Sequence, residues 1–245
     1  MAYSEKTFGN KYEHGVQLHK YTGTLSIFAP TNPKLERPAF LLHLNGIDSA
    51  NNTVAGCLYD LKAARDLRFG GYYSLDGLID LSRKVRDYLA SQTDGKKTPA
   101  FKSVQKLVQK MVNYRKPKPP KDKATPPKPG DPPLSKARST SEQSFGSIMR
   151  DGEDIYQIIL KAAGYAPSNP QITTAGYLAS IAALKVLNDT VTAKYQDYDN
   201  AVEIRFALYQ GVDGLRDRMQ QTKEYLASQY SKKSNEYKDA VKIKY

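Results

Sequence analysis

The chain has 245 residues, a formal net charge of +12 and 40% hydrophobic residues, which is enough apolar material for a buried core. Its single cysteine, Cys57, excludes a disulfide framework and a cysteine-based metal site. No apolar run approaches the ~18 residues that a membrane span needs. The first residues also lack the apolar stretch of a signal peptide. We therefore expect a soluble, cytoplasmic protein with no membrane partner.

The chain contains the same sequence twice, at an offset of 137 residues. Pairing residues 4–92 with residues 141–229 without gaps gives 27 identities in 89 pairs. Both copies carry the same landmarks in the same order, namely an APxNP run, an Asn before a Thr-Val pair, and the motifs RFxxY, DGLxD and YLASQ. A repeat this long is not a solenoid unit. We predict two homologous halves, residues 1–114 and 141–245, joined by residues 115–140.

The first helix of each half is clearest in the second copy. There, Ile155, Ile158 and Ile159 share one helical face, and Gly164 is placed to end the helix. The counterpart in the first half is less clear, because residues 21–27 are rich in β-branched side chains and also suit a short strand. Homologous halves share a fold, so we predict a helix in both.

A long helix follows in each half, after the turns at Pro33 and Pro170. We predict it over residues 36–72 and 171–209. Apolar residues alternate in steps of four and three, which is typical of a heptad seam and of coiled-coil-like packing. The predicted seam positions are Phe40, Leu44, Ile47, Asn51, Val54, Leu58, Leu61 and Arg65, and in the second half Tyr177, Ile181, Leu184, Asn188, Val191, Tyr195, Tyr198 and Val202.

The DGL runs break the long helices, and Asp76 and Asp213 are the predicted N-caps of the next helix in each half. Each half then closes with a short helix, over residues 101–111 and 236–243. Two helices packed along one side of each long helix leave its other side uncovered, so the halves must pack together. We predict an all-α fold, an elongated helical bundle of two tandem homologous repeats that form one composite bundle with a four-helix-bundle-like cross-section.

Two shared features of the long helices have more than one interpretation. Asn51 and Asn188 occupy equivalent seam positions, where a polar side chain can fix the register of packing; alternatively, both face water. The RFxxY motif can offer Arg68 and Arg205 to an anion or a partner. We favour a structural role, in which each arginine complements the helix dipole while the Phe and Tyr pack in the core.

The segment between the halves is basic and proline-rich. We name eight residues as candidate polyanion-binding residues, namely Arg115, Lys116, Lys118, Lys121, Lys123, Lys128, Lys136 and Arg138. Such residues bind phosphates without sequence preference and in a salt-dependent way. The segment therefore predicts either nucleic-acid binding or only a soluble spacer.

No catalytic, metal-binding or cofactor-binding motif stands out. The DGLxD motif offers two carboxylates, whereas a calcium loop supplies five or more oxygen positions. Nucleotide-binding, zinc and nucleophile motifs are missing from the sequence. We therefore expect no enzyme, no cofactor, no metal and no small-molecule substrate. The sequence favours a structural or interaction protein that binds another protein or itself, with sequence-independent nucleic-acid binding as the alternative.

Four runs also resemble those of small, internally duplicated, all-helical proteins of no assigned function. They are SNP at residues 168–170, DGLRD at 213–217, ASQY at 227–230 and NEYK at 235–238. The resemblance covers both halves. It implies a duplicated helical fold, and it implies no activity, ligand or catalytic residue.

Overall fold

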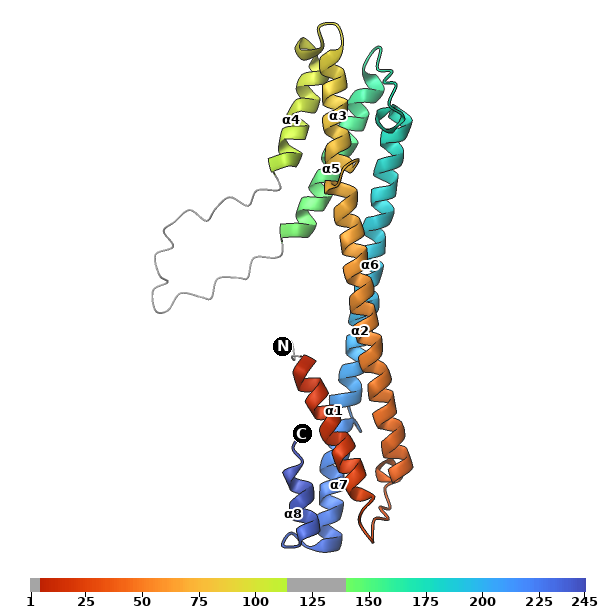
Figure 1. Ribbon diagram of the computed structural model, residues 1–245, viewed down its shortest axis with the longest axis vertical. Coiled ribbons are helices and arrows are strands. Elements are labelled where there is room, and N and C mark those ends of the chain that lie inside the picture. Colours follow the sequence, from red (N-terminus) through yellow and green to blue (C-terminus); the bar gives the residue numbers. More distant parts are fainter. Residues whose placement is uncertain (1–4, 114–139) are drawn as a thin grey trace, which may run out of the picture. The chain divides into compact units, whose positions relative to one another are not determined.

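The computed structural model describes residues 5–113 and 140–245, and these residues form helices and connecting turns without a strand. The helices are α1 (Glu5–Thr22), α2 (Arg37–Tyr73), α3 (Leu78–Ser91), α4 (Pro99–Asn113), α5 (Thr140–Lys161), α6 (Thr174–Gln210), α7 (Leu215–Tyr230) and α8 (Asn235–Lys242) (Figure 1). The all-α prediction is confirmed. The strand alternative for residues 21–27 is wrong, because α1 continues to Thr22 and a turn follows.

The ends of these helices follow the local sequence closely. The two long helices each have 37 residues and begin at positions 137 apart. Short 3₁₀ turns precede them, Pro33–Leu35 and Pro170–Ile172, and an Asn side chain caps each turn. Asn32 accepts a hydrogen bond from the Lys34 amide, and Asn169 accepts one from the Gln171 amide. The shared APxNP run is therefore a helix-initiating turn, with Pro at the position where it costs no hydrogen bond.

The described residues divide into two compact units that do not follow the repeat boundaries. Unit 1 comprises residues 1–62 and 193–245, and unit 2 comprises residues 63–192. Unit 1 therefore contains α1, the first part of α2, the last part of α6, α7 and α8. Unit 2 contains the counterpart of each, namely α5, the first part of α6, the last part of α2, α3 and α4. Each unit thus draws residues from both predicted repeats.

The core of unit 1 is built from apolar faces of α1, α2, α6, α7 and α8. Its fully buried members include Leu18, Phe40, Ile47, Leu215 and Leu226. Gly15 of α1 lies against α7, since a Cβ there would lie 2.8 Å from Leu215 Cδ1. The absence of a side chain at Gly15 lets the leucine of the DGL run pack against α1.

The core of unit 2 uses the equivalent faces. Val85, Val104, Ile148, Ile155 and Tyr177 are fully buried there. Gly152 repeats the role of Gly15, with its missing Cβ 2.9 Å from Leu78 Cδ2. This explains why the two halves share a glycine at this position of an otherwise divergent helix.

The predicted seam is correct for the first part of each long helix. Beyond that part it holds at Leu61, and Tyr198 and Val202 are half-buried, but it fails at three positions. Positions up to Val54 and Val191 are buried or half-buried, but Leu58 is 46% exposed and Tyr195 is 42% exposed. Arg65 is also exposed. Beyond the middle, the buried positions are Leu61, Ala64 and Tyr72 in α2, and Ala201, Arg205 and Tyr209 in α6. A single heptad phase fails because the two ends of each helix pack into different cores.

Among the described residues, no helix is both long enough and apolar enough to cross a bilayer.

Candidate functional site

In unit 1, four side chains from three helices form a connected polar and aromatic cluster, which we call lock 1. Asn51 of α2 donates its Nδ2 hydrogen to the Tyr209 hydroxyl at 3.1 Å, and that hydroxyl donates to the Phe8 carbonyl at 3.0 Å. The Phe8 and Tyr209 rings lie 4.8 Å apart between centroids. The Arg205 guanidinium lies 4.5 Å from the Phe8 ring centroid, a cation–π distance. Lock 1 thus joins two α6 residues to α1 and α2.

Unit 2 contains the equivalent cluster, lock 2, at positions 137 residues away. Asn188 donates to the Tyr72 hydroxyl at 2.9 Å, and the Tyr72 and Phe145 rings lie 4.9 Å apart. The Arg68 guanidinium lies 4.4 Å from the Phe145 ring centroid. Both tyrosines are fully buried, and burial is the main reason that their pKa values are raised. The Oδ1 atom of each asparagine is also buried, with no hydrogen-bond partner.

The two locks show where the structure places the shared motifs. Each asparagine binds a tyrosine of the other half, while the structure shows no hydrogen bond between Asn51 and Asn188. Their register-setting role stays a prediction. The structural interpretation of RFxxY was correct for the tyrosines and wrong for the phenylalanines, and the role of the arginines at the helix dipole stays a prediction. Each arginine packs on an aromatic ring of the other half, and Phe69 and Phe206 are exposed. The sequence does not predict that Phe8 and Phe145 contact these arginines, although both phenylalanines are repeated.

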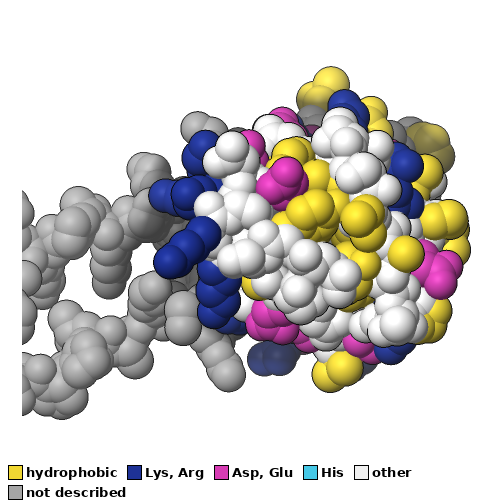
Figure 2. Space-filling model, turned by 90° about the horizontal axis from the view of Figure 1, so that it is seen from below, with side chains coloured by type: hydrophobic (Ala, Val, Ile, Leu, Met, Phe, Trp, Pro, Cys, Tyr) yellow, Lys and Arg dark blue, Asp and Glu magenta, His cyan; other side chains and the backbone are white. Residues whose placement is uncertain are grey.

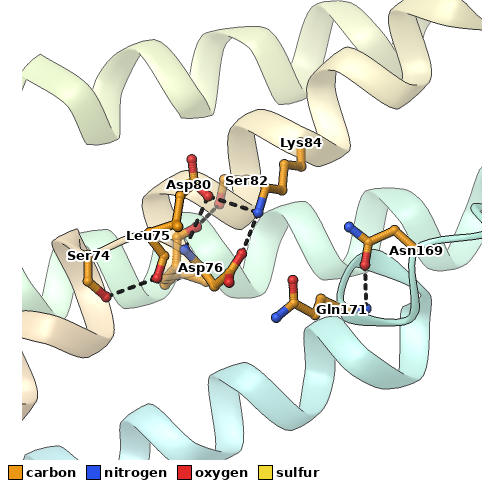
Figure 3. Close-up of polar contacts among 9 residues, drawn as sticks. Ser74, Leu75, Asp76, Asp80, Ser82, Lys84, Asn169 and Gln171 are labelled. Atoms are coloured by element: carbon orange, nitrogen blue, oxygen red, sulfur yellow. Dashed lines mark hydrogen bonds and ion pairs between the residues drawn. The ribbon is translucent and has the colours of Figure 1, made fainter.

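The DGL turn of unit 2 forms a second polar cluster, shown in Figure 3. Asp76 is not the N-cap of α3; it lies one residue earlier, with φ of 64°, and Gly77 is the N-cap. The backbone amide of Asp76 donates to Asp80 Oδ2 at 3.2 Å. The Lys84 amino group lies between the two carboxylates, paired with Asp76 and 3.0 Å from Asp80 Oδ2. Gln171 approaches Asp76 from the 3₁₀ turn of the other half.

The equivalent turn of unit 1 has the same aspartate but a different lysine. Asp213 again has a positive φ, 61°, with Gly214 as the N-cap. Its carboxylate pairs with Lys34, which comes from the 3₁₀ turn of the first half. Asn32, beside Lys34, donates to Gln221 Oε1 at 3.1 Å.

The two turns have therefore exchanged a lysine and a glutamine. Lys34 corresponds to Gln171, and Lys84 corresponds to Gln221. In unit 1 the lysine is on the 3₁₀ turn, and in unit 2 it is on the helix after the DGL run. Each aspartate keeps one lysine partner, which also lowers its carboxyl pKa through a direct hydrogen bond. Both aspartates have a positive φ in this turn. This explains the residue type, since Asp tolerates the left-handed region better than most residues.

We predict that Lys34→Gln raises the pKa of the Asp213 carboxyl toward its ordinary value. A lowered pKa in the folded state stabilises the fold at neutral pH, and this contribution is lost as the pH falls through that lowered pKa. The measurement is an NMR titration of the aspartate carboxyl carbons. Adding Gln221→Lys, which copies unit 2, restores the low value, whereas Lys84→Gln shifts Asp76 and leaves Asp213 unchanged. An Asp213 pKa that stays low in Lys34→Gln assigns the effect to Arg218 instead.

The eight candidate polyanion-binding residues, from Arg115 to Arg138, lie outside the described residues. Within the described ranges, no group of three or more His, Cys, Asp or Glu side chains is placed to hold a metal ion. The two carboxylates of the DGLxD motif in unit 2 instead hold Lys84.

The surface carries apolar side chains that the cores do not use. Ten of the exposed large apolar residues form five pairs at the repeat offset, with exposed fractions from 42% to 93%. The pairs are Leu41 with Leu178, Leu58 with Tyr195, Leu67 with Ile204, Phe69 with Phe206, and Leu75 with Val212. Four of the pairs place one member in each unit. These paired positions are the candidate interaction surface, and only the structure separates them from core positions.

The connection between α1 and α2 lies at one end of unit 1. Apolar side chains are also exposed at this end, which Figure 2 shows from below. Hydrophobic side chains gather near the middle of this end, with acidic side chains beside them and Lys and Arg collected on one side. The connection at this end is held by tyrosine hydroxyls of α7. Tyr230 accepts from the Ile27 amide at 3.0 Å and donates to the Ile27 carbonyl at 2.6 Å, while Tyr225 accepts from the Ala29 amide at 3.1 Å.

Comparison with known protein families, with curated proteins and with solved structures finds no match to this chain.

Proposed function

We propose that this chain is a non-enzymatic helical scaffold that binds another protein, or a second copy of itself, through the paired apolar positions. The observation that carries this proposal is their repetition. Leu41 and Phe69 are identical to their counterparts Leu178 and Phe206, and all four are exposed, although the Phe69 ring also lies 4.7 Å from the Tyr73 ring. We propose that these residues contribute to contiguous apolar patches, because such patches mark interaction surfaces.

The distribution of the pairs supports two equivalent binding faces. Unit 1 carries Leu41, Ile204, Phe206 and Val212, and unit 2 carries their counterparts. We therefore propose one face on each unit, each able to bind the same partner element. Two equivalent faces on one chain suit a scaffold that engages a duplicated or symmetric partner and gains avidity from it.

The finer architecture belongs to the same proposal. We infer that residues 1–114 and residues 141–245 are homologous repeats that form one composite bundle. Locks 1 and 2 support this, because equivalent residues make equivalent contacts and each lock takes residues from both halves. The elongated shape, the four-helix-bundle-like cross-section and the cytoplasmic location stay predictions.

The test replaces the identical apolar pairs with serine. We expect Leu41→Ser, Phe69→Ser, Leu178→Ser and Phe206→Ser together to weaken partner capture or self-association by about tenfold or more, as truncating buried interface anchors does. Sedimentation velocity measures self-association, and quantitative pull-down from native extract measures partner capture. Changing only one unit's pair removes one of the two faces and lowers the stoichiometry.

The chain supplies matched controls. Tyr59 and Val186 are 75% and 63% exposed, and their counterparts are the polar residues Gln196 and Ser49. We expect Tyr59→Ser and Val186→Ser to leave binding unchanged. Equal effects from paired and unpaired positions contradict the proposal. If the variants melt at a lower temperature but bind as before, the paired residues stabilise the packing of their own helices and do not form a binding surface.

Sequence-independent nucleic-acid binding through Arg115–Arg138 stays the alternative from the sequence. Nuclease-treated and untreated arms of the same pull-down separate it from protein binding. Capture that disappears after nuclease treatment favours the alternative.

A further inference from the structure

Unit 1 has a hollow of about 410 Å³ beside the 3₁₀ turn that begins α2. Its lining includes the apolar residues Pro33, Ala39, Leu42 and Leu208. It also includes Lys34, His43 and Arg218. The hollow is open to solvent, and it combines apolar residues with a few polar groups, as small-molecule sites do.

The basic groups of the hollow are held in place by backbone carbonyls. Arg218 donates from Nε to the Asp213 carbonyl at 2.9 Å and from Nη1 to the Lys34 carbonyl at 2.5 Å. His43 Nε2 lies 3.0 Å from the Leu208 carbonyl oxygen, so Nε2 carries the hydrogen. The fold therefore fixes both rigidly beside the apolar wall.

The electrostatic setting of the hollow favours an added negative charge. Loss of solvent lowers the pKa of Arg218 and is also the largest cause that lowers the pKa of His43, with the Arg218 charge adding to the effect on His43. Both shifts show that positive charge is costly here. The carboxylate of Asp213 pairs with Lys34 and its charge also acts on Arg218, whose hydrogen bonds go to uncharged carbonyls. A carboxylate beside a partly desolvated guanidinium gains a strong, charge-assisted hydrogen bond.

The helical fold does not require this basic character. In unit 2, the positions that correspond to Lys34, His43 and Arg218 hold Gln171, Ser180 and Leu81, and all three are uncharged. The apolar wall also differs, since Leu42 corresponds to Ala179 and Leu208 to Gly71. Unit 2 keeps the same helices and the same lock without these residues, so the combination in unit 1 needs another explanation.

We propose that the hollow of unit 1 binds a small amphipathic carboxylate, with its apolar part against Leu42 and Leu208 and its carboxylate toward Arg218. The ligand class follows from the lining of the hollow, because an uncharged apolar molecule gains nothing from the Arg218 charge and a hydrophilic anion gains nothing from the leucines. The inference is independent of the paired apolar positions, none of which lines the hollow.

The test is an NMR titration of the isotope-labelled full chain with octanoate, alongside octylammonium and acetate. We expect saturable shifts from octanoate at the amides of residues 39–46 and 208–218. Octylammonium has the same tail and the opposite charge, and acetate has the charge without the tail, so both should bind at least about tenfold more weakly, which is ~1.4 kcal/mol. Equal binding of octanoate and octylammonium, or no saturable octanoate binding, overturns the proposal.

Two variants test the residues. Leu42→Ala with His43→Ser installs the residues that unit 2 has at these positions, so the fold should tolerate both. Arg218→Gln removes the charge, and its thermal melt is recorded because Arg218 also holds the DGL turn. Each is expected to weaken octanoate binding by about tenfold. Tyr59→Ser is the unaffected control. Unchanged binding in a folded Leu42→Ala, His43→Ser protein places the ligand elsewhere and contradicts the proposal.

Discussion

Residues 141–245 on their own are expected to lose cooperative helical structure or to self-associate, and residues 1–114 are expected to restore a folded 1:1 complex when the two are mixed. Each compact unit takes residues from both halves, so either half alone lacks part of both cores. Half of lock 1 and half of lock 2 are missing as well. Circular dichroism and sedimentation of each fragment and of the mixture measure the effect.

The halves are also expected to prefer each other over copies of themselves. If two copies of residues 141–245 paired in the same way, each Asp213 would meet Gln171 and Gln221 and would lack its lysine. Steric fit points the same way. At Gly71, a Cβ would already lie 2.6 Å from Leu184 Cδ2, and the residue equivalent to Gly71 in the second half is the larger Leu208. Overpacking of this kind costs about 1–3 kcal/mol.

A neighbouring pair of glycines provides the control for this fragment experiment. Gly71→Leu in residues 1–114 should weaken the complex, whereas Gly70→Leu should not, because a Cβ at Gly70 meets nothing within 4 Å. A stable, cooperative monomer of residues 141–245 would show that the halves are independent domains, and it would contradict the composite bundle.

The second large effect is expected at the locks. Tyr209→Phe removes the buried hydroxyl that accepts from the Asn51 side-chain amide and donates to the Phe8 carbonyl, which costs about 1–3 kcal/mol. Tyr72→Phe removes the equivalent bond from Asn188. The locks share no residue, so the two losses should add. Urea unfolding of the single and double variants measures them.

A double-mutant cycle separates the lock from ordinary packing. Asn51→Leu removes the unpartnered Oδ1 together with the donor, so it should cost little in the Tyr209→Phe background and offset part of the loss. Tyr59→Phe, at a side chain that is 75% exposed, should change stability by less than ~0.5 kcal/mol. A Tyr209→Phe protein as stable as the original would mean that the hydroxyl does not hold lock 1 together.

The preference of each asparagine for a tyrosine of the other half also sharpens the register hypothesis. Replacing both asparagines with leucine is expected to allow more than one packing register. An entirely apolar seam can pack in several registers, whereas a buried donor finds its acceptor in only one of them. The measurement is sedimentation of the mixed fragments, residues 1–114 and 141–245, in which the double variant should lose the 1:1 stoichiometry.

Much of the fold follows from local sequence. The starts and ends of α2 and α6 lie within a few residues of the predicted ones, because proline, Asn capping and the DGL break act within one or two turns of the chain. The helix after each DGL run buries residues spaced three or four apart, as the pattern of a single amphipathic face requires. Leu78, Leu81, Val85 and Leu89, like Leu215, Met219, Thr222 and Leu226, are buried. A short amphipathic helix packs into one core, so one period describes all of it.

Only the tertiary structure decided which residues of the two halves meet. The sequence marks Asn51, Arg205 and Tyr209 as repeated, but it does not say that they join Phe8, since each contact links residues far apart in the chain. The contacts of the long helices were the hardest to predict. Each long helix contributes to two cores, so a single heptad phase cannot describe both of its ends. The same limit applies to the surface, where Phe69 and Phe206 resemble core residues in sequence. Their exposure becomes visible only when every neighbouring helix is in place, since burial is a property of the packed units and not of one helix.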